Sequence, residues 1–223
     1  MSSHFSAVWV AAIGLLASSV MAQPDEPDSA VYALVESTTE QVMEVVTAAE
    51  AYVEDEPERY YDQVQGLLDP LIDYRGFARQ VMGPYASSKR YRSLDEAGRK
   101  QLREQLDRFT QVMRLSLVRT YSKGLLAFGT ARIEVQPPEA EQSATSRVSV
   151  KQLIYTESEQ PYVVLYQMGQ GKSGEWMLRN VIIESVNLGE IYRDQFLASA
   201  RKQDGDLDAV IDSWTTVTVD VES

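Results

Sequence analysis

The sequence contains no cysteine and a single histidine, His4, among its 223 residues. Without cysteine the chain forms no disulfide and has no thiolate to act as a nucleophile or metal ligand. One histidine is too few for a histidine-based metal centre, and His4 lies in a segment that we expect to be removed. A Ser/His/Asp or Cys/His catalytic arrangement is therefore excluded in the mature chain, and no spacing of acidic residues stands out as a metal site.

Positive charge is also scarce in this sequence. Lysine and arginine number 21 against 33 aspartate and glutamate residues, which gives a formal net charge of −12. A nucleic-acid-binding protein needs a basic stripe, and the potential of an anionic bilayer would repel the body of an acidic protein. We therefore expect no nucleic acid as partner and no stable residence on a membrane surface.

The chain has no apolar run long enough to be a confident membrane span. Residues 5–20 are mostly apolar, but a spanning helix needs about 20 apolar residues. A small-residue cleavage site ends at Ala22, so we interpret residues 1–22 as a secretory signal peptide, although no Lys or Arg precedes its apolar run. An uncleaved anchor is the alternative. The proline-rich and acidic stretch 23–29 predicts a short disordered leader.

The stretch 93–128 reads as one very long amphipathic helix. Ser93 followed by Glu96 has the form of a capping box that would start it. At 1.5 Å per residue the helix would run about 50 Å, so a bend or break is expected, with Gly124 as the best candidate. Apolar residues recur along it at steps of three or four and share one face, which needs an apolar cover. They are Leu102, Leu106, Phe109, Met113, Leu117, Tyr121, Leu125 and Phe128.

Shorter elements surround this helix in the sequence. Apolar periodicity and capping residues predict further helices at 30–53, 57–68, 74–82, 188–202 and 207–214. After Gly129 the apolar period changes from 3.6 to 2, which predicts strands at 131–136, 147–156, 162–168 and 175–186. Short turns between these strands imply antiparallel pairing. The prediction is one α+β domain over 30–216, with an antiparallel four-stranded sheet packed against several helices and a polar tail at 217–223.

Several polar motifs have simple structural explanations. The glycine-rich stretch 169–173 resembles part of a phosphate loop, but no helix follows it, so it predicts a hairpin turn. Asp73 is best explained as a helix cap and Asp69 as a turn residue before proline. Glu184 near a strand end is either a buried acid with a raised pKa or, as we favour, a salt-bridged or solvated edge residue.

Basic residues are locally concentrated although the chain is acidic. They form either a solvated face or a patch for lipid phosphate or a docking partner. The residues concerned are Arg75, Arg79, Lys89, Arg90, Arg92, Arg99, Lys100 and Arg103.

Aromatic residues and methionines gather at the expected contacts between helices and sheet. The simplest interpretation is an ordinary core, although methionine also adapts to irregular apolar ligands. This set comprises Tyr74, Phe77, Met82, Phe109, Met113, Tyr121, Tyr155, Tyr166, Met168, Trp176, Tyr192 and Phe196.

A series of short motifs follows one order along the chain. They are an acidic-aromatic helix start and glycine end at 73–83, a helix with Phe109 and Thr120-Tyr121, a last strand with Trp176, a Tyr-Arg-x-x-Phe segment at 192–196 and a Gly-x-Leu-x-x-x-Ile segment at 205–211. In this order and spacing, over about residues 30–215, the sequence resembles the MlaC (toluene-tolerance) family. Ser185 and Asn187 depart from the family's usual glycine and serine, and its usual aromatic pair after residue 85 is missing.

The resemblance implies a soluble carrier of phospholipid in the Gram-negative periplasm, with an MlaC-like, NTF2-like cone as its fold. Such carriers move lipid between an outer-membrane lipoprotein/porin complex and an inner-membrane ABC transporter with its substrate-binding ring, and so maintain outer-membrane lipid asymmetry. The resemblance implies no enzyme activity and no cofactor, only phospholipid as cargo, with acyl chains in an apolar pocket between sheet and helices. The residues expected to line that pocket are Tyr74, Phe77, Val81, Phe109, Met113, Leu117, Tyr121, Leu125, Val164, Tyr166, Met168, Trp176, Leu178, Val181, Ile183 and Tyr192.

Two alternatives remain open at this point. An isomerase- or dehydratase-like enzyme with a small pocket would use Glu184 together with a tyrosine. A periplasmic interaction module without a ligand would have a filled core. A long apolar cavity favours the carrier, and a converging carboxylate and tyrosine favours the enzyme.

Overall fold

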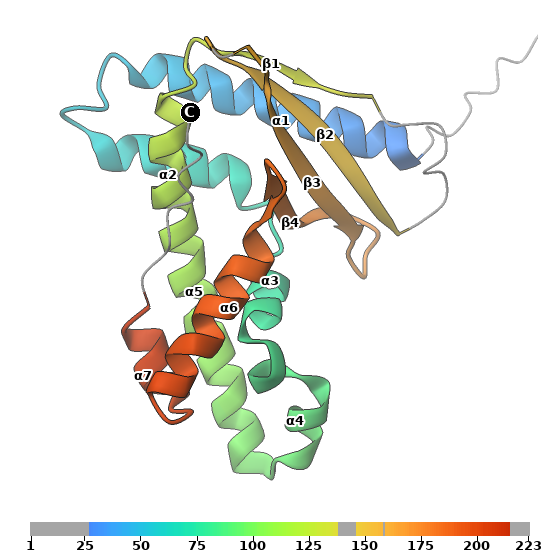
Figure 1. Ribbon diagram of the computed structural model, residues 1–223, viewed down its shortest axis with the longest axis vertical. Coiled ribbons are helices and arrows are strands. Elements are labelled where there is room, and N and C mark those ends of the chain that lie inside the picture. Colours follow the sequence, from blue (N-terminus) through green and yellow to red (C-terminus); the bar gives the residue numbers. More distant parts are fainter. Residues whose placement is uncertain (1–26, 138–145, 158, 215–223) are drawn as a thin grey trace, which may run out of the picture.

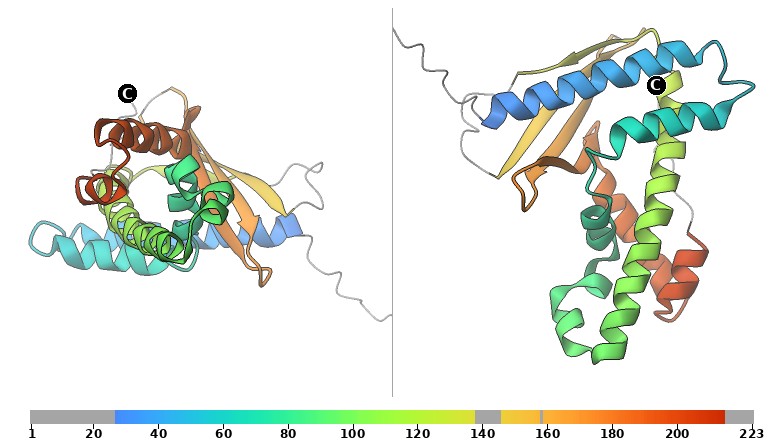
Figure 2. Two further views of the ribbon diagram at one scale, coloured as in Figure 1. Left: turned by 90° about the horizontal axis from the view of Figure 1, so that it is seen from below. Right: turned by 180° about the vertical axis from the view of Figure 1, so that it is seen from behind.

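The computed structural model describes residues 27–137, 146–157 and 159–214. The expected signal peptide, 1–22, and the expected tail, 217–223, lie outside the described residues. Two helices, α1 (Pro27–Ala49) and α2 (Pro57–Leu68), lie side by side at one end of the long helix α5 (Glu96–Leu126) (Figures 1 and 2). Around the rest of α5 lie α3 (Tyr74–Met82), the 3-10 helix η1 (Gly83–Ala86), α4 (Ser88–Ser93), α6 (Leu188–Lys202) and α7 (Leu207–Asp212).

The strands form one antiparallel sheet in the order β1-β2-β3-β4-β5. The predicted α+β class and antiparallel pairing are confirmed. The sheet has a fifth strand that the sequence did not suggest, because it is only two residues long. The strands are β1 (Arg132–Val135), β2 (Arg147–Tyr155), β3 (Tyr162–Gln170), β4 (Trp176–Ile183) and β5 (Val186–Asn187).

Helix α1 covers one face of this sheet. Along β2, buried Val148 and Val150 alternate with exposed Arg147 and Ser149, so the strand has an apolar and a polar face. Val31 of α1 packs with these two valines in one apolar cluster. The opposite face of this part of the sheet is therefore polar.

A short stretch of chain ties α3 to the free edge of β4. The Leu178 amide donates to the carbonyl of Leu71 at 2.8 Å, and the Asp73 amide donates to the carbonyl of Leu178 at 3.1 Å. The Asp73 side chain then accepts from the Gly76 amide at 2.9 Å, which confirms that Asp73 caps α3. The start of α3 is thus fixed directly against the sheet.

The long helix α5 is present, but it begins and ends differently from the prediction. Asp95, not Ser93, is its N-cap and accepts from the Gly98 amide at 2.8 Å. Ser93 instead ends α4, where its hydroxyl donates to the carbonyl of Arg90. The helix continues through Gly124 to Leu126 without a break, because neighbouring elements pack along it and stabilise one long segment.

Two other helices have boundaries different from those expected. Helix α1 starts at Pro27, not 30, and ends at Ala49, with turns occupying 50–55. Proline suits the first turn of a helix, so residues 27–29 join α1 and not a disordered leader. Helix α7 ends at Asp212, ahead of the predicted residue 214.

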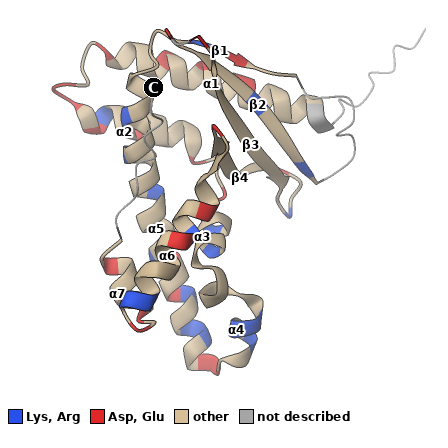
Figure 3. Cartoon of the chain, in the orientation of Figure 1, with Lys and Arg blue, Asp and Glu red and all other residues tan. Residues whose placement is uncertain are grey.

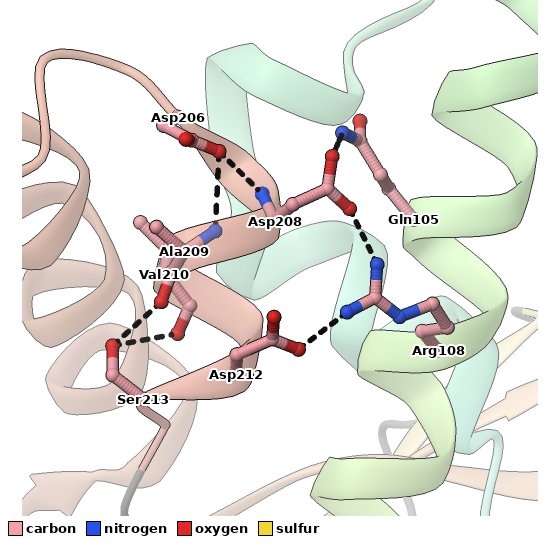
Figure 4. A network of polar contacts seen from close by, with 8 residues as sticks. All are labelled: Gln105, Arg108, Asp206, Asp208, Ala209, Val210, Asp212 and Ser213. Atoms are coloured by element: carbon pink, nitrogen blue, oxygen red, sulfur yellow. Dashed lines mark hydrogen bonds and ion pairs between the residues drawn. The ribbon is translucent and has the colours of Figure 1, made fainter.

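Helix α7 is held on α5 by polar contacts (Figure 4). Arg108 of α5 pairs with both Asp208 and Asp212, and the Gln105 amide donates to Asp208 at 2.9 Å. Asp206 caps α7 by accepting from the amides of the next turn. These ion pairs and hydrogen bonds hold the C-terminal end of the described chain against the middle of α5.

Candidate functional site

Apolar residues from α3, α5 and α6 form the largest packed cluster, which we call the helical cluster. Fully buried Phe109 contacts Phe196 and Trp214, with ring centroids 5.0 Å apart in each pair. Of the residues expected to line a lipid pocket, five are buried members of it: Phe77, Val81, Phe109, Met113 and Tyr192. They form the wall of the interior and are packed against other protein atoms.

A second cluster lies between α1 and the sheet, and we call it the sheet cluster. Met168 and Leu178 are buried in it, and Tyr166, Trp176 and Val181 pack against its edge while only partly buried. The Tyr166 hydroxyl donates to the side-chain carbonyl of Gln152 at 2.8 Å. Burial raises the pKa of Tyr166 above its ordinary range, so this phenol remains a neutral hydrogen-bonding group.

Half-buried apolar residues connect the two clusters. Val181 of β4 packs against both the helical and the sheet cluster. Leu117 and Tyr121 of α5 and Ile183 of β4 pack against the helical cluster and are only partly buried. Predicted pocket residues from α5 and β4 therefore border the helical cluster without being enclosed by it, and we call these four residues the boundary between α5 and β4.

A pair of tyrosine hydroxyls lies at this boundary. The oxygens of Tyr121 and Tyr192 are 2.9 Å apart. Burial is the largest cause that raises the pKa of each phenol. Either hydroxyl can be the donor of this hydrogen bond, which pairs the two phenols within the apolar surroundings of the helical cluster.

The remaining three predicted pocket residues lie elsewhere. Leu125 packs against a third cluster, formed mainly by α1 and α2. Val164 is buried on β3. Tyr74 is buried at the start of α3, and its pKa is raised first by burial and then by the nearby Asp69 carboxylate. Asp69 itself pairs with Arg114, so it does more than the turn role expected for it.

A large cavity lies on the other side of α3 and of the sheet. Its volume is about 1260 Å³, and it extends between α3, η1 and the polar face of β2–β4. Of the predicted pocket residues only Met168 lines it. The lining instead includes four arginines from four different elements: Arg79, Arg147, Arg179 and Arg193.

Sequence reasoning singled out Arg79 but not the other three arginines of this cavity. Arg147, Arg179 and Arg193 come from β2, β4 and α6 and lie far apart in the sequence. The sequence pattern did show which face of its strand Arg147 occupies, because Arg147 alternates with the buried valines of β2. The predicted basic cluster does gather in space along α4 and the neighbouring end of α5 (Figure 3).

The structure offers little support for acid–base chemistry at the residues considered. Glu184 is exposed at the turn between β4 and β5, where its φ is +48°, and its carboxylate accepts from the Val163 amide. This agrees with the favoured interpretation of an edge residue. The Gly171 amide donates to the carbonyl of Glu175 at 2.7 Å, so the glycine-rich stretch is a hairpin turn between β3 and β4. Within the described ranges, no group of His, Cys, Asp or Glu residues is placed to hold a metal ion.

Fold and site together define an α+β protein whose helices and antiparallel sheet enclose a divided apolar interior. One solved structure with this fold is that of the phospholipid-binding protein from Ralstonia solanacearum in complex with a phospholipid. The TM-score is 0.66 and the sequence identity 18%, and the match covers 81% of this chain and 92% of that one. Within the part of the chain that the structure describes, no helix is both long and apolar enough to cross a membrane.

The chain belongs to the MlaC protein family, which it matches over residues 36–216. Toluene tolerance protein ttg2D of Pseudomonas putida is 29% identical to it over 181 residues, which cover 81% of this chain and 78% of that protein. The resemblance read from the sequence motifs is thereby confirmed. The family is a non-enzymatic one, which agrees with the expectation that this chain is not an enzyme.

Proposed function

We propose that this protein is a soluble periplasmic carrier that binds a phospholipid by its acyl chains. The observation that carries the proposal is this half-buried apolar boundary: Leu117, Tyr121 and Ile183 pack against the helical cluster, and Val181 packs against both the helical and the sheet cluster. Membership of the MlaC family and the likeness to a phospholipid-binding protein support it. Acyl chains would complete the contact between the two apolar clusters at this place.

A carrier of this kind must offset a large free-energy cost of exposing acyl chains to water. Each methylene exposed to water costs about 0.8 kcal/mol, so two chains of about 15 methylenes represent roughly 24 kcal/mol of gross exposure. Only an apolar interior shared between lipid and protein can offset this in an aqueous compartment. The acidic body of the protein, with its net charge of −12, favours release from an anionic membrane once lipid has been exchanged.

The further parts of the proposal follow from the expected location. Residues 1–22 would direct the chain to the periplasm and be cleaved near Ala22, and residues 30–216 would form the lipid-binding domain. The exchange partners would be an outer-membrane lipoprotein/porin complex and an inner-membrane ABC transporter with its substrate-binding ring. The carrier would then contribute to outer-membrane lipid asymmetry.

A lipid analysis with a charge-matched pair of variants tests this proposal. Leu117 is half-buried on the side of α5 that packs on the helical cluster, whereas Leu115, on the same helix, is 50% exposed. We expect mass spectrometry to find phospholipid bound to the wild type and to Leu115→Asp purified from periplasm, and at least tenfold less bound to Leu117→Asp, because that carboxylate would lie among the acyl chains.

Uptake of phospholipid from vesicles by delipidated protein is the second readout, and circular dichroism of both variants is the control for folding. Absence of phospholipid from the wild type, together with no uptake from vesicles, would overturn the carrier function. Equal lipid loading of the two variants would overturn the placement of the chains beside α5.

A further inference from the structure

Charge is distributed unevenly between the two ends of α5. Residues 27–68, which form α1, α2 and the turns between them, hold ten acidic side chains and a single basic one, Arg59. Residues 74–107, from α3 to the first turns of α5, hold eight basic and four acidic side chains. We call the surface formed by residues 74–107 the basic face, and its cations gather around α4 and the start of α5 (Figure 3). An acidic protein therefore presents a cationic surface at one end.

The acidic side chains of the basic face do not neutralise most of its cations. Asp95 caps α5, and Glu96 lies in the first turn of that helix. The other two acids pair with Arg75 and Lys100. Six cations remain that form no ion pair with a carboxylate in the described part of the chain, and all of them except Arg99 are exposed. They are Arg79, Lys89, Arg90, Arg92, Arg99 and Arg103.

Tyr91 positions two of these arginines without neutralising them. The guanidinium carbons of Arg99 and Arg103 lie 5.7 and 6.0 Å from the centroid of the Tyr91 ring, close enough for a cation–π contact. Arg103 also donates to the Tyr91 hydroxyl at 2.6 Å, and Arg99 donates to the carbonyls of Tyr91 and Arg92, each at 3.1 Å. All of these partners are neutral, so both positive charges persist. Because the two side chains are held before a ligand arrives, less entropy is lost on binding.

A groove opens in the basic face between α3, η1, α4 and α5. Its volume is about 350 Å³. Leu102 and Leu106 of α5 and Ala86 of η1 give it an apolar lining. A groove that is both apolar and cationic suits a ligand that carries an apolar side chain together with carboxylates. The cationic part of the lining comes from three helices and consists of Arg75, Arg79, Arg92 and Arg103.

A protein segment fits this groove better than a bilayer does. A helix that lies on a membrane surface inserts exposed apolar side chains into it. Among the described residues the one large apolar side chain that is exposed is Leu115, which lies outside the basic face. The apolar part of the basic face lies inside the groove, where Leu102 and Leu106 are only 5% and 8% exposed. A side chain that enters the groove can reach them, whereas a flat bilayer surface cannot.

We propose that this groove docks an acidic segment of a partner protein. An apolar side chain of the segment contacts Leu102 and Leu106, and carboxylates on either side of it pair with Arg79, Arg92 and Arg103. The planar guanidinium fork matches the two oxygens of a carboxylate. Opposite charge on the two surfaces also speeds their encounter and orients it. This docking site goes beyond the carrier function and does not depend on lipid being the cargo.

Binding of a fluorescent peptide tests the proposal. The probe is a synthetic peptide in which aspartates and glutamates flank a central leucine. One control peptide has asparagine and glutamine in place of its acids, and another has glycine in place of its leucine. The test variant is Arg79→Gln with Arg92→Gln, because both side chains are exposed and neither forms an ion pair or hydrogen bond within the described ranges. The matched control variant is Arg201→Gln with Lys202→Gln, which removes two exposed charges at the end of α6.

Fluorescence anisotropy at low ionic strength measures the binding. The acidic peptide should bind the wild type and the control variant, and it should bind the test variant at least tenfold more weakly. The peptide without acids should bind the wild type at least tenfold more weakly than the acidic peptide, and the peptide without leucine should also bind more weakly. Added salt should weaken the binding, because it screens the charges. If the acidic peptide does not bind the wild type, or binds the test variant as well as the control variant, the proposed docking site is wrong.

Two further measurements identify a different occupant of the groove. Co-sedimentation with vesicles of phosphatidylglycerol and phosphatidylcholine that is lost in the test variant, without peptide binding, would assign the basic face to a membrane and overturn the proposal. Self-association of the wild type that is lost in the test variant would make the occupant a second copy of this chain, whose exposed stretch 54–58 holds four acidic side chains. Mass spectrometry of co-purified phospholipid is a separate readout, so failure of the docking site would leave the carrier function standing.

Discussion

Tyr60 illustrates how a single buried hydroxyl contributes to stability and to its pH dependence. The side chain is fully buried, and its hydroxyl donates to the carbonyl of Ser122 at 2.8 Å, which joins α2 to α5. Burial is the main cause that raises the pKa of Tyr60 from 10.0 to about 12. The unfolded chain therefore loses this proton at lower pH than the folded chain does.

Below pH 10 we expect ionisation of Tyr60 to have no effect on the free energy of unfolding. As the pH rises from about 10 towards 12, we expect this free energy to fall. A shift of about two units corresponds to roughly 3 kcal/mol at the upper end. Tyr60→Phe should cost about 1 kcal/mol at neutral pH through the lost hydrogen bond. It should also reduce the alkaline slope by about one proton, as measured by urea unfolding between pH 8 and 11.5. Tyr61→Phe, on the adjacent half-buried ring, is the control, and an unchanged slope in Tyr60→Phe would contradict the prediction.

The role of a single residue could be predicted from the sequence where its partners are close to it along the chain. Asp73 was identified as a cap because the amide it accepts from belongs to Gly76, three residues along the same chain. Phe109 and Met113 were identified as interior residues because helical spacing alone puts them on one face. Arg147 and Arg193 were missed because nothing near them in the sequence shows that β2 and α6 line the same cavity.

At the scale of elements, α7 is a short helix that depends on its cap. Asp206 accepts from the amides of Asp208 and Ala209 at 3.0 and 3.1 Å. We expect Asp206→Ala to lower the free energy of unfolding by about 1 kcal/mol, the usual effect of losing an N-cap. Arg108→Gln should have a smaller effect, since the side chains of its ion pairs with Asp208 and Asp212 are 41–69% exposed. Urea unfolding measures both, and a larger loss in Arg108→Gln would contradict this order.

The boundaries of α5 show why element ends were harder to predict than element existence. Eight apolar residues at helical spacing were enough to establish the helix, but Ser93 and Asp95 are both good caps. The choice of Asp95 follows from α4, which uses Ser93 as its own last residue. Strand β5 was missed for a related reason: two residues carry no period, and Val186 pairs only because the turn at 184–185 brings it back to Ile183.

At the scale of the whole molecule, the apolar interior is divided between the two ends of α5. The helical cluster occupies the part of α5 near α3, α6 and α7, and the third cluster occupies the part near α1 and α2. The apolar periodicity of the sequence runs along the whole of α5, so it predicted that the helix has a buried face in both clusters. It could not show that the interior is divided, because the division depends on which other elements pack along each part of the helix.

A carrier whose interior is completed by its cargo should be less stable without it. A ligand present at about a thousandfold its dissociation constant stabilises the folded state by roughly 4 kcal/mol. For a chain of this size each kcal/mol shifts the melting temperature by about 2–4 °C. We therefore expect delipidation to lower the melting temperature by on the order of 10 °C and reloading with phospholipid to restore it.

The variants used for lipid loading make this prediction specific to the boundary between α5 and β4. Leu115→Asp should show the same gain on reloading as the wild type, because the side chain at 115 is exposed. Leu117→Asp should show little gain, because its carboxylate would occupy the place where the chains pack. Scanning calorimetry of the delipidated and reloaded proteins measures the difference. A melting temperature that does not change while lipid remains bound would mean that the cargo lies on the surface and is not part of the interior.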